Sequence, residues 1–146
     1  MTTAAEILAA VRAAYPKCAV VREVSIPDNQ HQWRDRASKP IRRIDALLRD
    51  TSGYTAIEIK VTRGDFKRDT EEKRRAWQAH TRRFIYATPA GLVNPSEVPS
   101  GCGLWEFDGT RLTIAKKASI NKEPLAMPRS VFDTMLYRVS NYERAA

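Results

Sequence analysis

Two carboxylates and a lysine in this 146-residue chain have the types and spacing that metal-assisted hydrolysis requires. Asp45 ends the run RRID, and Glu58 and Lys60 lie in the later run AIEIKV. Glu58 and Lys60 are two residues apart, so in a β-strand both side chains leave the same face of the sheet. The opposite face then holds the apolar side chains of Ile57, Ile59 and Val61.

These residue types indicate phosphodiester hydrolysis. Carboxylate oxygens suit Mg²⁺, which keeps several of its waters when it is bound in this way. A cation between Asp45 and Glu58 would also compensate charge that is unfavourable on an apolar strand. A bound metal lowers the pKa of a water ligand, and Lys60 can orient that water and neutralise charge developing on a phosphate. We therefore predict a catalytic centre at Asp45, Glu58 and Lys60, with Mg²⁺ as cofactor and Mn²⁺ as a substitute.

The alternative is a solvated ion pair between Glu58 and Lys60 on the open face of a half-buried sheet. Short patterns of this kind arise by chance. Here, however, the pattern spans two predicted neighbouring strands and precedes a basic helix, which favours the hydrolytic centre.

The elements that must position these residues follow from hydrophobic periodicity and turn residues. A helix is predicted at 4–14 and strands at 19–26, 41–49 and 54–62, the last two joined by a turn at Ser52–Gly53. A helical region then runs from Gly64 to about Arg83 with Asp65 as N-cap. It is followed by a strand at 84–88, a hairpin turning at Asp108–Gly109 and a helix at 129–142. This order predicts one mixed α/β domain over residues 1–146.

Aromatic and apolar side chains indicate the core. Trp77 and Phe84 are interpreted as core residues rather than as platforms for stacking bases. The last helix is expected to have an apolar side, formed by Val131, Phe132, Met135, Leu136 and Val139.

The charge of the chain favours a polyanionic partner, most often nucleic acid. There are 25 Lys and Arg against 17 Asp and Glu, giving a net charge of +8 and a pI near 9.8. In the basic helical region we expect Arg63, Lys67 and Lys73 to face DNA. The acidic residues there are expected to form i,i+4 pairs such as Asp69–Lys73 and Glu71–Arg75.

The stretch between Pro27 and Pro40 reads as a loop. Its Trp33 and Arg34 are candidate DNA contacts, because a tryptophan among basic residues can stack on an unpaired base. Trp33 lying flat on the protein surface is an equal alternative.

Composition excludes other classes. No run approaches 18 apolar residues, so no membrane-spanning helix is expected. The N-terminus lacks the pattern of a secretory signal. Cys18 and Cys102 lie far apart, which argues against a zinc site or a disulfide framework and favours buried free thiols in a cytoplasm. We expect a prokaryotic or phage-encoded protein in the host cytoplasm.

At Asp45, Glu58 and Lys60 the chain resembles the PD-(D/E)xK nuclease superfamily, although no proline precedes Asp45. The run EIKVTRGDFKRD, the basic helix, FIYATP and GLWEFD resemble the MmcB-like DNA-repair nucleases, over about Val21 to Asp108. The resemblance implies a restriction-endonuclease-like mixed sheet flanked by helices. It further implies a DNA nuclease of repair, recombination or phage DNA processing, possible specificity for branched DNA, and a homodimer.

The resemblance also implies two further site residues. The Ile59 carbonyl would complete the protein ligands of the metal. An upstream acid would assist catalysis, and this is Glu23 or, from the first helix, Glu6; Glu23 is preferred for its place just before the hairpin.

Two other function classes remain open. A catalytically inactive DNA-binding module could use the same fold, although all three central residues are present. An RNA-binding protein would fit the charge, but no RRM-like aromatic motif or KH-like loop is found.

Overall fold

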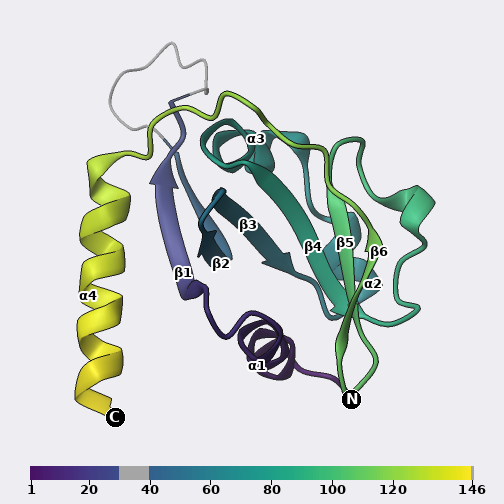
Figure 1. Cartoon of the computed structure of the whole chain (residues 1–146). Coiled ribbons are helices and arrows are strands. Elements are labelled where there is room, and N and C mark those ends of the chain that lie inside the picture. The colour runs from purple at the N-terminus through teal and green to yellow at the C-terminus, as the bar shows by residue number, and fades with distance from the viewer. Residues whose placement is uncertain (30–39, 146) are drawn as a thin grey trace.

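A computed structural model describes residues 1–29 and 40–145, and these residues build a mixed sheet flanked by helices (Figure 1). The six strands lie in the order β1-β2-β3-β4-β5-β6. The β3–β4 and β4–β5 pairs are parallel and the other pairs antiparallel. The predicted α/β class is confirmed. The described helices and strands are α1 (Ala4–Ala14), β1 (Ala19–Pro27), β2 (Ile41–Asp50), β3 (Gly53–Ile59), α2 (Arg63–Lys67), α3 (Glu71–His80), β4 (Arg83–Pro89), the 3-10 helix η1 (Pro95–Glu97), β5 (Gly103–Phe107), β6 (Leu112–Lys116) and α4 (Arg129–Ala145).

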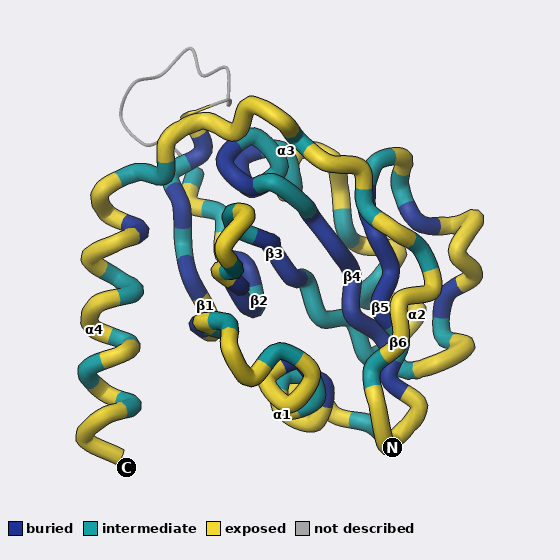
Figure 2. Tube along the Cα trace, in the orientation of Figure 1, coloured by how far each residue is buried: buried dark blue, intermediate teal, exposed yellow. Residues whose placement is uncertain are grey.

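The sheet separates two apolar clusters (Figure 2). On one face, α1 buries Ile7 and Val11 in a cluster with Ile57 of β3. On the other face, α3 buries Trp77 in a cluster that includes Phe84. The prediction that Trp77 and Phe84 belong to the core is therefore confirmed. Both thiols are free, but only Cys102 is buried and Cys18 is half-buried, so the expectation of two buried thiols is wrong for Cys18.

The predicted β2–β3 hairpin is present and sets the register of the central strands. Its turn is held by Asp50, whose Oδ1 accepts the amides of Ser52 at 2.7 Å and Gly53 at 3.0 Å. Ala46 then pairs with Ile57. Asp45 precedes Ala46 in β2, and Glu58 follows Ile57 in β3. Because the strands are antiparallel, Asp45 and Glu58 are neighbours across the hairpin.

The helical region after β3 is two helices, and the prediction of one helix up to Arg83 is wrong. Thr62 caps α2 by accepting the amide of Asp65, and Thr70 caps α3 by accepting the amide of Lys73. Asp65 is thus inside the first turn, and its prediction as N-cap is also wrong. A second threonine cap so soon after the first breaks the helix, because each cap residue takes extended backbone angles. The chain turns at this break, and Arg83 already belongs to β4.

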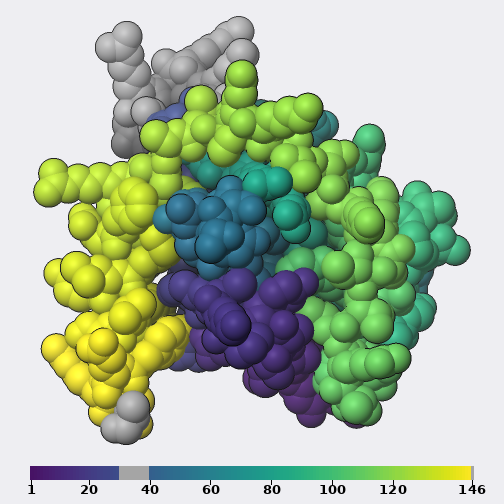
Figure 3. Space-filling view, viewed as in Figure 1, coloured from purple at the N-terminus to yellow at the C-terminus, as the bar shows by residue number. Residues whose placement is uncertain are grey.

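Helix α4 packs along the edge strand β1 and forms one side of the molecule (Figures 1 and 3). Of its predicted apolar side only Val131 is buried, while Phe132, Leu136 and Val139 remain exposed. Most of the predicted apolar side of this helix is therefore exposed. Among the described residues, no helix has the length and apolar character needed to cross a membrane.

Candidate active site

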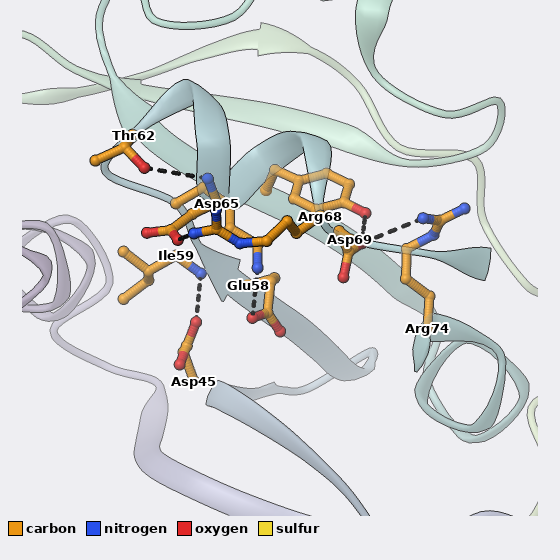
Figure 4. Close-up of polar contacts among 10 residues, drawn as sticks. Asp45, Glu58, Ile59, Thr62, Asp65, Arg68, Asp69 and Arg74 are labelled. Carbon is orange, nitrogen blue, oxygen red and sulfur yellow. Dashed lines mark hydrogen bonds and ion pairs between the residues drawn. The ribbon is translucent and has the colours of Figure 1, made fainter. Parts of the chain in front are cut away.

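Asp45 and Glu58 meet where β2 and β3 lie side by side (Figure 4). Asp45 Oδ2 accepts the backbone amide of Ile59 at 2.8 Å, which fixes its carboxylate against the end of β3. The Glu58 carboxyl group lies close enough to Asp45 for the two side chains to interact electrostatically. Its side chain is only 18% exposed, so water does little to disperse its charge.

This crowding changes the ionisation of Glu58. Burial, followed by the charge of Asp45, raises the pKa of Glu58 from 4.5 to about 8, and Lys60 opposes the shift only in part. Asp69, which lies between α2 and α3, raises the pKa of Glu58 further. At neutral pH the raised pKa favours the protonated form of Glu58. A cation bound between the two carboxyl groups would favour their charged forms instead.

Lys60 follows directly after the last residue of β3. Its backbone amide donates to the Ala87 carbonyl at 3.0 Å, which continues the alignment of β3 with β4 for one more residue. Its Nζ lies 3.5 Å from Glu58 Oε1. The prediction that Glu58 and Lys60 share one face is confirmed, and Lys60 is only 16% exposed.

The donors at this point suit a hard divalent cation. Asp45 and Glu58 bring carboxylate oxygens close together, and burial, followed by the charge of Asp45, raises the pKa of Glu58. Within residues 1–29 and 40–145, no group of three Asp, Glu, His or Cys side chains could hold a metal together. Two carboxylates with water completing the shell are a Mg²⁺ arrangement rather than a zinc one. Ile59 faces Asp45 through its amide, which places its backbone at the same point.

Glu23 of β1 lies opposite Asp45 of the neighbouring strand β2. Arg22 pairs with Ala46 and Val24 with Ile44, so Glu23 is the residue opposite Asp45. It lines a cavity of about 200 Å³ together with Asp45 and Ile59. Its φ of 52° is in the left-handed region, where a non-glycine residue is strained. Arg138 of α4 lies 3.9 Å from its carboxylate.

Glu6, the other candidate for the upstream acid, has a different position. Its carboxylate accepts the Thr3 amide at 3.1 Å, and its own amide donates to Thr3 Oγ1 at 3.2 Å. These bonds form a capping box at the start of α1. Glu6 is therefore committed to the helix, whereas Glu23 borders the cavity beside Asp45.

A second group of polar residues adjoins Glu58 on the side of α2 and α3, and the sequence interpretation missed it. Tyr86 donates its hydroxyl hydrogen to Asp69, and Arg74 Nη1 lies 3.2 Å from Asp69 Oδ2. The expected Asp69–Lys73 pair is wrong, because Asp69 lies before the break and turns towards Arg74. Nothing in the sequence marks Tyr86, which lies in an otherwise apolar strand.

The predicted DNA contacts are spread over different surfaces. Lys73 borders the cavity that contains Glu58 and Lys60. Arg63 instead donates to the Leu92 carbonyl at 2.9 Å and pairs with Glu97 at 2.9 Å. That pair lowers the pKa of Glu97 to about 2, and Lys67 contributes to the same lowering from its exposed position. Trp33 and Arg34 lie outside the described residues.

No family model and no curated protein matches this sequence. Among solved structures, the chain is similar to SPO1766, a protein of unknown function from Silicibacter pomeroyi. The TM-score is 0.62 at 18% sequence identity, and the alignment covers 95% of this chain and 84% of the other. At this identity the similarity shows that the two proteins share a fold.

Proposed function

We propose that the chain is a metal-dependent DNA nuclease with a PD-(D/E)xK centre on a restriction-endonuclease-like sheet. The observation that carries this proposal is the proximity of Asp45 and Glu58 at the end of the β2–β3 hairpin, with Lys60 beside Glu58. Two carboxylates that need a cation, next to a lysine on the same face, form the minimal arrangement for hydrolysing a phosphodiester with a bound metal.

Each residue has a distinct role in this proposal. Asp45 and Glu58 would hold the ion, with the Ile59 carbonyl as a third ligand. Mg²⁺, or Mn²⁺ in its place, supplies an activated water and polarises the phosphoryl oxygen when it is bound. Lys60 orients the attacking water and neutralises charge that develops on the phosphate. Glu23 positions a further water from the neighbouring strand β1.

DNA as the substrate is supported by charge. The net charge of +8 suits a polyanion, and several cations surround Glu58 and Lys60. The biological setting in repair, recombination or phage DNA processing, and the assembly of a homodimer, stay predictions from the resemblance described above.

The direct test is cleavage of supercoiled, linear, single-stranded and branched DNA in Mg²⁺, Mn²⁺ or EDTA. Wild-type protein should cleave at least one of these substrates with metal and none in EDTA. Asp45→Asn and Glu58→Gln should abolish cleavage and Mn²⁺ binding measured by calorimetry. Glu143→Gln, an exposed change of the same chemistry in α4, should do neither.

Failure of the wild type to cleave any of these substrates would overturn the nuclease assignment. Retained DNA binding in that case would favour the inactive DNA-binding module. Mn²⁺ binding that persists in Asp45→Asn would mean that the metal binds elsewhere.

A further inference from the structure

A cavity opens in the angle between α2 and α3, directly beside Glu58 and Lys60. Residues on both sides of the break at 68–70 line it. We call it the corner pocket. Its volume is about 240 Å³. Its floor is formed by the buried side chains of Ile44, Trp77 and Phe84.

The charged wall of the corner pocket has more positive than negative groups. The cationic residues that line it are Arg43, Lys60, Arg68, Lys73 and Arg74, and the acidic residues are Glu58, Asp65 and Asp69. Asp65, Arg68, Asp69 and Arg74 gather on the side of Glu58 that faces away from Asp45 (Figure 4). Even when all three acids are charged, the pocket has two more positive than negative groups.

The ion pairs identify which cations are left over. Arg68 pairs with Asp65, Arg74 with Asp69 and Lys60 with Glu58. Across residues 1–29 and 40–145, no acidic side chain lies within ion-pair distance of Arg43 or Lys73. Arg74 Nε is buried and, within the same residues, has no hydrogen-bond partner. The pocket thus offers two uncompensated positive charges at Arg43 and Lys73.

We propose that the corner pocket binds a phosphate group of the DNA, adjacent along the strand to the phosphate that is cleaved. The inference rests on the proposed nuclease function, because it takes Glu58 and Lys60 as the cleavage centre. Guanidinium and ammonium groups are the standard partners of phosphate oxygens. Lys60 and Glu58 belong to both the pocket and the centre, so a phosphate held here is adjacent to the reacting one.

A nucleobase fits the corner pocket less well than a phosphate does. Trp77 is only 1% exposed, and its Nε1 donates to the Arg42 carbonyl at 3.0 Å. Its ring is therefore already packed and presents no face for stacking. The bound phosphate can come from an internal linkage or from a strand end, and both present the same chemistry to Arg43 and Lys73.

The test measures binding of single-stranded oligonucleotides, with and without a 5′-phosphate, to the full chain in EDTA over a range of salt. Arg43→Ala and Lys73→Ala are compared with Lys17→Ala, a change at an exposed lysine after α1. Each pocket variant should weaken binding on the order of tenfold, as the loss of a charge-assisted hydrogen bond does. Each should also reduce the slope of log K against log salt by about 0.7. Lys17→Ala should change affinity by less than about twofold.

The two oligonucleotides separate the sources of the phosphate. Equal losses with both would assign the pocket to an internal linkage, and losses confined to the phosphorylated one would assign it to a strand end. Pocket variants that bind like Lys17→Ala would overturn the proposal, even if the wild type cleaves DNA. Conversely, pocket-dependent binding by a protein that never cleaves would leave the pocket intact and refute only the nuclease centre.

Discussion

At neutral pH, replacing Glu58 by Gln should stabilise the metal-free protein, although the same change should abolish the proposed activity. Gln is neutral at every pH and has an N–H group that could donate to Asp45. Glu58 has a pKa of about 8 in the folded protein against an ordinary value of 4.5. Because its folded pKa is raised, the contribution of Glu58 to the free energy of unfolding is greatest below pH 4.5 and falls as the pH rises towards 8.

The magnitude follows from proton linkage. Each pH unit between the two pKa values lowers the stability of the wild type by about 1.4 kcal/mol. From about pH 5 to about pH 7 the loss is therefore about 3 kcal/mol. Glu58→Gln has no such group, so its stability relative to the wild type should rise by that amount over the same interval.

Denaturant unfolding in EDTA, at about pH 5 and about pH 7, measures this difference directly. Glu143→Gln is the control, since this exposed residue should give the same difference from wild type at both pH values. Addition of Mn²⁺ at the higher pH should stabilise wild type and leave Glu58→Gln unchanged. If the two proteins keep a constant difference across the pH range, Glu58 is already ionised in the folded state and the argument for uncompensated charge fails.

Two further predictions concern the residues around the carboxylates. Lys60→Ala should lower the single-turnover cleavage rate about 100-fold or more, because one transition-state donor is lost. Its affinity for oligonucleotides at fixed salt should fall only slightly. Normal cleavage by this variant would make Lys60 a structural residue. Glu23→Gly should be more stable in denaturant unfolding than Glu23→Ala by about 1 kcal/mol, because glycine tolerates the left-handed backbone at this position; both variants should lose the same part of the cleavage rate, and equal stabilities would mean that the backbone is not strained there.

The carboxylate pair could be predicted from the sequence because its geometry is local. Ser52 and Gly53 mark the turn, and strand pairing then follows from the alternation of β2 and β3. Asp45 and Glu58 come together in this way with no contribution from distant residues. The position of Lys60 on the same face as Glu58 follows from the two-residue side-chain period of a strand. One hairpin thus carries all three central residues.

The corner pocket could not be predicted in the same way. A signal for the helix break was present, since Thr70 is followed by Glu71 and Glu72, as at many helix starts. The basic residues on either side made one continuous helix the simpler interpretation. The contact between Tyr86 and Asp69 brings together residues 17 apart on different elements, and it depends on how α2 sits against β4.

The backbone conformation of Glu23 could not be predicted from the sequence, although the family resemblance pointed to Glu23 itself. No local rule predicts a glutamate at φ 52° within a strand, because such a residue costs on the order of 1 kcal/mol or more. Its partner is Arg138, 115 residues later, which donates to the Glu23 carbonyl at 3.4 Å and lies 3.9 Å from its carboxylate. Arg138 belongs to α4, so the conformation of Glu23 beside Asp45 depends on a contact with a helix far along the chain.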